Sequence, residues 1–193
     1  MVNGKEAFMH FKSSWKKLSN TRWLALIASF IALKIGMSFF SIPVGENLYF
    51  SLTFLVVALE AMLIGPAAGI VSGAVTDLIG YFINPMGPWF PGYTLTAMLG
   101  EFVYGCFFYE KEIRWRHIIG AKIITSYGDN VLLGSLWSAM LYGKGYLYYA
   151  AKSLIKNTVL LPFQIALLGA FFALLFPILK KYRLREEELR LKR

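Results

Sequence analysis

The chain has 193 residues, of which 57% are hydrophobic and only 16% are charged. A soluble domain carries about 25% charged residues, so this composition excludes an ordinary soluble protein and indicates a surface that faces lipid. A spanning helix needs roughly 20 apolar residues, which leaves room for six spans and no separate soluble domain. We therefore expect a single membrane domain over residues 1–193, with a basic cytoplasmic N-terminus (1–21), a six-helix bundle (22–180) and a charged cytoplasmic tail (181–193).

The formal net charge of +9 raises the possibility of nucleic-acid binding, but the position of the basic residues argues against it. They gather at the two chain ends and in residues 110–117, which is how the positive-inside bias looks in a multi-span protein. The N-terminus has no small-residue cleavage site before the first span, so it does not resemble a removed signal peptide. The single cysteine, Cys106, cannot form an internal disulfide, and no Cys/His cluster has metal-ligand spacing. We expect no nucleic-acid partner, no metal and no cofactor.

The predicted elements are six apolar segments separated by polar or Gly/Pro-rich breaks. In chain order they cover residues 22–40, 48–64, 67–83, 93–109, 118–141 and 154–179. The breaks are rich in turn-forming residues, as at Gly65-Pro66 and in residues 84–91, which contain three prolines. The sequence thus predicts an all-α integral membrane protein with six transmembrane helices.

The charge of the loops predicts the orientation of this bundle. If both termini lie inside, the loops 41–47, 84–91 and 142–149 lie outside, and among them they hold only one basic residue, Lys144. The reverse orientation would place almost every basic loop residue on the wrong side of the membrane. We therefore expect both the N-terminus and the C-terminus inside.

The three outer loops have an unusual composition, because they combine Pro, Gly and Asn with aromatic residues. Irregular backbone near lipid must be buried in protein or line a cavity, so these loops predict a covered pocket that opens outward. The alternative is an interfacial belt of aromatic residues. The pair Trp89-Phe90, set between two prolines, favours the pocket, whereas Tyr146, Tyr148 and Tyr149 fit either interpretation.

Charged residues inside spans are costly and are functional candidates by default. Two lysines near the outer end of the last span, Lys152 and Lys156, are four residues apart and share one helix face, where they would suit an anionic ligand such as a carboxylate. Asn130 and Trp137, seven apart, share a face of the fifth span. The charged residues inside or at the ends of spans are Lys34, Glu60, Asp77, Glu101, Lys122, Asp129, Lys152 and Lys156.

Several of these charges have a structural explanation instead. Lys122 and Lys152 lie near span ends and can extend their amines to the interface. Asp77 and Glu101 can pair with Lys34 or Lys122 and hold the helices together.

Nothing in the sequence resembles a catalytic centre. No nucleophile stands beside a base, and the two histidines, His10 and His117, lie in inner polar segments. A Walker-type phosphate loop is also absent from the sequence, so ATP-driven work would need a partner. We expect a protein that is not an enzyme.

Small residues recur at helical spacing in two spans. In the first span, Ala28, Ala32 and Gly36 form a smooth stripe where another helix can approach closely. This stripe predicts either a partner protein or packing against a helix of the same chain. For the three glycines in residues 65–73 we favour internal packing.

Several short motifs, in order, resemble those of a known family. They are Leu48-Tyr-Phe-Ser-Leu-Thr-Phe54, Leu63-Ile-Gly-Pro66, Asp77-Leu-Ile-Gly80 and Phe90-Pro-Gly-Tyr-Thr-Leu95, followed by Asn130, Trp137, Tyr142-Gly-Lys144, Lys156-Asn157 and Pro162. Over roughly residues 20–180 the chain resembles the substrate-binding S components of energy-coupling factor (ECF) vitamin transporters, and within them the folate-type family.

This resemblance implies a function and a set of partners. It implies a six-helix bundle in the plasma membrane of a Gram-positive bacterium, which captures a vitamin from outside and associates with a transmembrane scaffold (T) subunit and two ATPase subunits. It also implies that the stripe beginning at Ala28 and Ala32 meets the scaffold, and that the S component tips over in the bilayer to release its cargo inward.

The chain departs from the folate-type pattern at one place. Relatives often carry a basic residue near the start of the second helix, where this chain has Leu48 and Tyr49. Recognition of the glutamate tail of folate would then depend on Lys152 or Lys156. Pantothenate, cobalamin and a pyrimidine precursor stay open as ligands, because S components share a fold while their pockets diverge.

The favoured hypothesis is a high-affinity vitamin-binding subunit with folate as its ligand. Aromatic residues would stack on the flat heterocycle, asparagines would bond its edge, and a lysine would hold a carboxylate. The predicted binding residues are Asn84, Trp89, Phe90, Tyr93, Asn130, Trp137, Lys156 and Asn157, and the predicted partner-binding residues are Ala28, Ala32 and Gly36.

Two hypotheses from other classes remain. A secondary transporter working alone would use Glu60, Asp77 and Glu101 as a charge relay at the membrane midplane. A scaffold or assembly protein would bind no small molecule at all.

Overall fold

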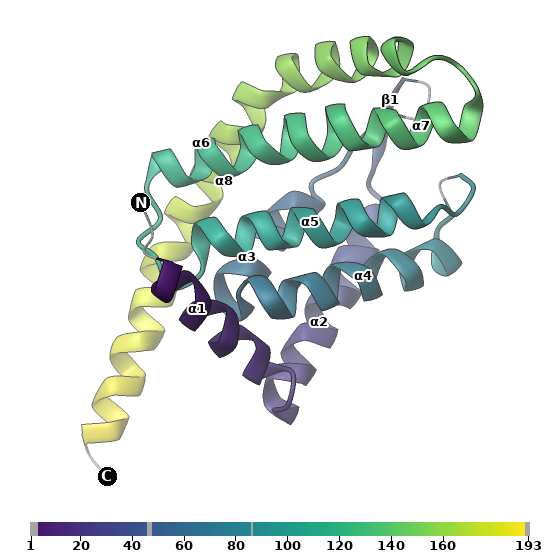
Figure 1. The fold of residues 1–193 in the computed structure, drawn as a ribbon. Helices are drawn as coiled ribbons and strands as arrows, with labels where there is room; N and C mark the ends of the chain where they lie inside the picture. The colour runs from purple at the N-terminus through teal and green to yellow at the C-terminus, as the bar shows by residue number, and fades with distance from the viewer. Residues whose placement is uncertain (1–3, 46–47, 86, 192–193) are drawn as a thin grey trace.

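The computed structural model describes residues 4–45, 48–85 and 87–191, most of which are helical (Figure 1). The helices are α1 (Gly4–Lys17), α2 (Thr21–Ser38), α3 (Thr53–Ile64), α4 (Pro66–Ile83), α5 (Pro91–Phe108), α6 (Trp115–Ile123), the π-helix η1 (Ile124–Leu133), α7 (Gly134–Tyr142) and α8 (Tyr146–Leu191). In Figure 1, α6, η1 and α7 run on as one rod beside the first half of α8.

Every predicted apolar segment contains a helix, but only some of these helices meet a length criterion for crossing a membrane. Within the described residues, three are long and apolar enough: Thr21–Ser38, Pro66–Ile83 and Tyr146–Pro177. The apolar helix α3, Thr53–Ile64, is shorter. Large apolar side chains such as Phe82, Leu147 and Leu174 are 72–83% exposed, as expected for a surface that faces lipid. The count of six spans stays a prediction.

The second predicted span is wrong at its start. Residues 48–52 do not begin a helix, because β2 (Leu48–Phe50) pairs antiparallel with β1 (Ile42–Gly45), with Ile42 opposite Phe50. Strand β1 therefore lies in the predicted outer loop, and β2 takes the first residues of the predicted span. An unbroken apolar run does not reveal where a strand gives way to a helix.

The turn between α3 and α4 is tight and depends on its glycine. Gly65 has a φ of 85°, a left-handed conformation that L side chains rarely adopt, and Pro66 then opens α4 at a position where its missing N–H costs nothing. A Cβ atom at position 65 would lie 2.8 Å from the Cβ of Ser14 and 2.9 Å from the ring of Tyr109.

Internal packing is confirmed for the glycine stripe. On α4, a Cβ atom at Gly73 would lie 2.8 Å from the carbonyl oxygen of Ala97 on α5, so the two helices approach too closely for any side chain there. The core beside these helices is built from buried residues of α3, α5, α6 and α8. Its members are Ala58, Ala61, Tyr104, Phe108, Ile118, Ala121, Leu168 and Phe172.

A buried ion cluster joins α2, α3, α4 and α5. Lys34 Nζ lies 2.5 Å from Glu60 Oε2 and 2.5 Å from Glu101 Oε1. Lys34 also donates to Ser72 Oγ (3.0 Å), and Ser72 donates to Glu60 Oε1 (2.5 Å). The predicted pairing of Glu101 with Lys34 is therefore confirmed. Asp77 instead accepts a hydrogen bond of 2.6 Å from Thr94.

Candidate ligand pocket

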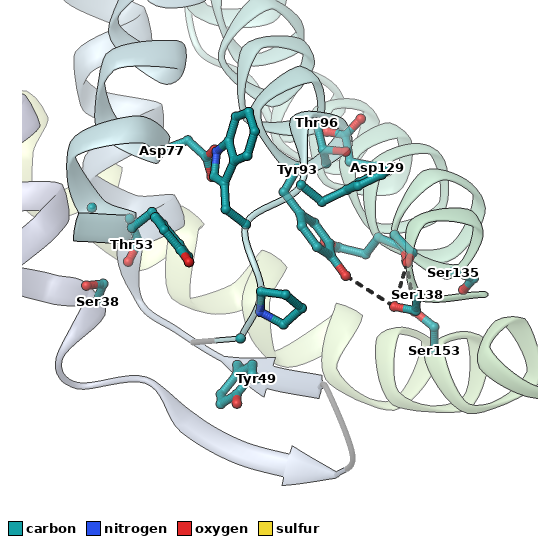
Figure 2. Close-up of a pocket in the computed structure, with 18 of the residues that line it drawn as sticks. Ser38, Tyr49, Thr53, Asp77, Tyr93, Thr96, Asp129, Ser135, Ser138 and Ser153 are labelled. Atoms are coloured by element: carbon teal, nitrogen blue, oxygen red, sulfur yellow. Dashed lines mark hydrogen bonds between the residues drawn. The ribbon is translucent and has the colours of Figure 1, made fainter. Parts of the chain in front are cut away.

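A cavity of about 450 Å³ opens among the helix ends near the β-hairpin (Figure 2). Volumes of roughly 300–1,000 Å³ are typical of small-molecule sites. Its walls come from α2, β2, α3, α4, α5, η1, α7 and α8, and from the loop before α5. The cavity is bordered by residues of this loop, of the hairpin and of both sides of the α7–α8 turn. It therefore lies at the end of the molecule that carries the predicted outer loops.

One wall of the cavity is aromatic. The ring centroid of Phe90 lies 5.6 Å from that of Trp137 and 6.3 Å from that of Tyr93. Trp137 Nε1 donates to Thr96 Oγ1 (2.9 Å), which fixes the orientation of the indole. Gly92 makes this packing possible, because a Cβ atom there would lie 2.5 Å from Trp137 and 2.6 Å from Phe90.

A second wall comes from the π-helix, in which Gly134 N–H donates to the carbonyl oxygen of Asp129 five residues earlier. Asp129 and Asn130 both line the cavity from this helix. Asn130 Nδ2 donates to Asn157 Oδ1 (3.3 Å), and Asn157 Nδ2 donates to the carbonyl oxygen of Ser153 (2.8 Å). Single π-helical turns inside α-helices occur frequently at functional sites, because they shift side chains relative to a regular helix.

The cavity carries charges of both signs on different elements. Asp77 lines it from α4 and Asp129 from η1, while Lys152 and Lys156 line it from α8. Lys156 Nζ donates to the carbonyl oxygen of Tyr49 (3.3 Å) and so ties α8 to the hairpin. The aspartates can accept hydrogen bonds from N–H groups of a ligand, and the lysines can bind its carboxylates.

The structure brings most of the predicted binding residues together. Six of them line the cavity: Asn84, Trp89, Phe90, Tyr93, Asn130 and Lys156. Trp137 and Asn157 are not among the lining residues, but Trp137 packs against Phe90 and Asn157 bonds to Asn130. Direct contact of any of the eight with a ligand stays a prediction.

Some lining residues were not among the predicted binding residues. They include Lys34, Tyr49, Asp77, Asp129, Ser135, Ser138, Tyr142 and Lys152. A sequence signal was present for three of these, because positions 135, 138 and 142 follow the i, i+3, i+7 spacing of one helix face. Figure 2 shows Ser138 beside Tyr93, whose hydroxyl is 3.4 Å from Ser138 Oγ.

The loop tyrosines divide between the two interpretations of the sequence. Tyr149 is 5% exposed and lines the cavity, whereas Tyr146 and Tyr148 are 37% and 40% exposed. Tyr149 therefore belongs to the pocket, and the other two fit an interfacial position.

The small-residue stripe of α2 faces away from the bundle. Ala28, Ala32 and Gly36 are exposed, and a Cβ atom at Gly36 would meet nothing within 4 Å. The alternative prediction, that this stripe packs against another helix of the same chain, is therefore wrong for the described residues.

The apolar helices and the mixed-charge cavity define a helical membrane protein with a small-molecule site. Residues 22–181 match the family model "ECF transporter, substrate-specific component", and the chain belongs to this family. It is therefore related to the substrate-binding subunits of transporters.

Related proteins of this chain are folate transporters. The chain is 33% identical to the folate transporter FolT of Clostridium novyi over 61% of this chain and 69% of that protein. It is 30% identical to FolT of Leuconostoc mesenteroides, over 77% of this chain and 83% of the relative. Its structure also resembles a crystal structure of FolT bound with folic acid, with a TM-score of 0.72 and 31% identity over 78% of this chain and 92% of that chain.

Proposed function

We propose that this chain is the folate-binding S component of an ATP-driven ECF importer. The observation that carries the proposal is the likeness to FolT bound with folic acid, which extends over 92% of that protein at 31% identity. The cavity of about 450 Å³ supports the proposal, because its volume is typical of small-molecule sites and its lining groups complement those of folate.

The chemistry of folate suits the cavity in three ways. Its flat heterocycle can stack on the wall around Phe90 and Tyr93, where an aromatic contact contributes roughly 0.5–1.5 kcal/mol. The N–H groups of the heterocycle can donate to Asp77 or Asp129, which line the cavity. The two carboxylates of the glutamate tail match the lysine pair of α8.

The topology that supports this function has six spans with both termini inside. This orientation places the cavity and its bordering loops on the outer side, where a vitamin arrives. The chain forms one membrane domain, in the plasma membrane of a Gram-positive bacterium, as the organisms of the FolT relatives suggest.

The proposed function requires partners. ATP hydrolysis belongs to two ATPase subunits, because the sequence has no Walker-type phosphate loop. A transmembrane T subunit connects them to this chain, and the exposed stripe of Ala28, Ala32 and Gly36 offers the close approach that helix contacts in membranes use.

The test is a titration of the purified, detergent-solubilised chain, followed by its tryptophan fluorescence. Trp89 lines the cavity and Trp137 packs against its wall, so folate should quench the emission saturably at nanomolar concentration. Pantothenate, cobalamin and a pyrimidine precursor serve as controls. Quenching by one of these and not by folate would change the proposed ligand but leave the chain a vitamin-binding S component. No quenching by any of them would favour a scaffold protein that binds no ligand.

A further inference from the structure

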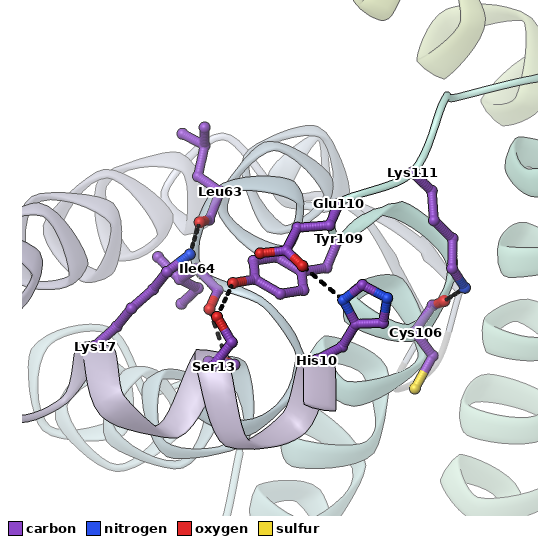
Figure 3. Close-up of polar contacts among 10 residues, drawn as sticks. His10, Ser13, Lys17, Leu63, Ile64, Cys106, Tyr109, Glu110 and Lys111 are labelled. Atoms are coloured by element: carbon purple, nitrogen blue, oxygen red, sulfur yellow. Dashed lines mark hydrogen bonds and ion pairs between the residues drawn. The ribbon is translucent and has the colours of Figure 1, made fainter. Parts of the chain in front are cut away.

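The N-terminal helix α1 lies outside the family match, which begins at residue 22. It is 14 residues long, or about 21 Å, which is too short to cross a bilayer. It packs at the end of the bundle opposite the cavity, against the α3–α4 turn and the end of α5 (Figure 3).

Polar side chains cover the face of α1 that touches the protein. Ser14 is fully buried; its Oγ donates to the carbonyl oxygen of Ile64 (2.7 Å) and accepts from Ala68 N–H (2.9 Å). Lys17 Nζ donates to the carbonyl oxygen of Leu63 (2.6 Å). These bonds satisfy backbone groups where α3 ends and α4 begins.

Two further contacts fix the rotation of α1 about its own axis. Ser13 Oγ lies 3.1 Å from the hydroxyl of Tyr109, and His10 Nδ1 lies 2.7 Å from Glu110 Oε2. Together with Ser14, these residues occupy one side of the helix. The opposite side is therefore held facing outward.

The outward face of α1 is apolar and basic. Phe8, Phe11 and Trp15 follow the i, i+3, i+7 spacing and are 67%, 38% and 56% exposed. Lys12 and Lys16 lie beside them and are also exposed. A helix with its polar residues against the protein and its aromatic residues outward is the reverse of a surface helix in water.

We propose that this outward face of α1 is an interfacial anchor that binds the anionic lipid surface at the basic end of the protein. The rings of Phe8, Phe11 and Trp15 enter the boundary between headgroups and acyl chains. Lys12 and Lys16 reach the lipid phosphates, where each basic residue near an anionic surface strengthens the attraction. The bonds of the inner face transmit this anchoring to the α3–α4 turn.

We favour lipid as the binding partner of this face because aromatic and basic side chains are interspersed on it. The surrounding segments are basic as well. Residues 111–117 at the same end contain Lys111, Arg114 and Arg116. The proposal is independent of which vitamin the cavity binds.

The first experiment measures the depth of α1 in the membrane. Single cysteines replace Phe8 or Phe11 in the full-length Cys106→Ser protein and carry a spin label, in nanodiscs of phosphatidylcholine with phosphatidylglycerol. Glu112→Cys is the matched control, because the side chain of Glu112 is 82% exposed at the same end of the molecule. Thermal unfolding of each variant verifies that it is folded.

Lipid contact predicts that oxygen, which concentrates in the bilayer, relaxes the labels at positions 8 and 11 several-fold more effectively than a water-soluble nickel chelate. The label at position 112 should show the opposite preference. Equal access of the nickel chelate to all three positions would overturn the proposal. Labels at 8 and 11 that neither reagent reaches would also overturn it, since they would indicate a contact between copies of the protein.

The second experiment tests the role of charge. Lys12→Gln with Lys16→Gln should lower the ratio of phosphatidylglycerol to phosphatidylcholine that the purified protein retains from mixed micelles, by about fivefold for each lysine. Lys144→Gln, in the loop at the other end, is the control and should leave the ratio unchanged. An unchanged ratio in the double variant would contradict the binding of lipid phosphates by this face.

Discussion

Lys34 is a buried lysine that forms ion pairs with two buried glutamates. The Lys34 side chain is 1% exposed, and its amine lies between the carboxylates of two glutamate side chains that are 0% and 3% exposed. A buried ion pair costs desolvation energy on both sides, so its presence alone does not imply extra stability. Removal of one partner is different, because it leaves charges buried without compensation.

Lys34→Met should therefore lower the free energy of unfolding by about 3–5 kcal/mol. Thermal unfolding in detergent measures the effect, and Lys34→Met combined with Glu60→Gln and Glu101→Gln should recover part of the loss. Equal unfolding temperatures of the wild-type and Lys34→Met proteins would show that the cluster is not held by its charges.

Trp89 differs from the other aromatic residues of the cavity because it is 46% exposed and stands on a loop. Its ring is free to cover a bound heterocycle. Trp89→Ala should weaken folate binding by about tenfold or more, which corresponds to roughly 1.4 kcal/mol. Isothermal titration measures this change, with Trp15→Ala at the opposite end as the control. Unchanged affinity would remove Trp89 from the site.

Lys156 tests how the ligand lies in the cavity. If the α8 lysines bind the glutamate tail, Lys156→Gln should weaken folate binding by about tenfold to a hundredfold, since a hydrogen bond to a charged group contributes roughly 1.5–3 kcal/mol. Binding of pteroate, which lacks the glutamate, should be nearly the same in both proteins. An equal loss for both ligands would place Lys156 elsewhere on the ligand or in a structural role through its bond to Tyr49.

The sequence predicted binding residues mainly by type, and this explains which cavity-lining residues were among them and which were not. Aromatic and amide residues beside loop prolines proved to line a cavity, as for Asn84, Trp89 and Phe90. Asp77 and Asp129 were visible as charges in spans, but only the fold shows that Asp129 and Asp77 face one cavity while Glu101 faces Lys34. The side on which a buried charge points depends on neighbouring helices that are distant in sequence.

At the scale of elements, two features could not be predicted from the sequence. An apolar run has no signal that separates the strand Leu48–Phe50 from the helix that follows it. The π-helix Ile124–Leu133 could not be predicted either. Its hydrogen bonds join residues five apart in place of four, which changes the direction of the side chains without a change in amino-acid composition. Glycine and proline, by contrast, marked the α3–α4 turn correctly, because glycine suits the positive φ of position 65 and proline is favoured at the first position of a helix.

The exposed small-residue stripe of α2 is the surface that we propose for contact with the T subunit. Ala28→Leu with Ala32→Leu should block the close approach of another helix while leaving folate binding unchanged, because neither residue lines the cavity. Co-purification with the T subunit and the ATPases from cells that express all components should fall at least several-fold. Leu33→Phe, on another exposed part of α2, is the control. Full assembly of the double variant would exclude the stripe as the partner surface.

At the scale of the whole molecule, composition and charge were sufficient to predict a membrane protein and the loops beside which its cavity lies. The cavity borders the loops that were expected outside, and the helix α1 and the basic segment 110–117 share the other end. The number of spans is harder to derive, because α3 has only 12 residues and is shorter than the roughly 20 residues that a spanning helix needs.

The proposed function and a secondary transporter differ in one respect: a secondary transporter moves its ligand across the membrane without partner subunits. Glu60 and Glu101 are bound to Lys34 in a cluster that joins four helices, and a relay would require these carboxylates to exchange partners. We therefore expect the purified chain in proteoliposomes to bind radiolabelled folate without accumulating it, under either a proton or a sodium gradient. Addition of the T subunit and the two ATPases with ATP should produce uptake that stops when ATP is replaced by a non-hydrolysable analogue. Accumulation by the chain alone would reverse this conclusion, because uptake would then need no partner subunit.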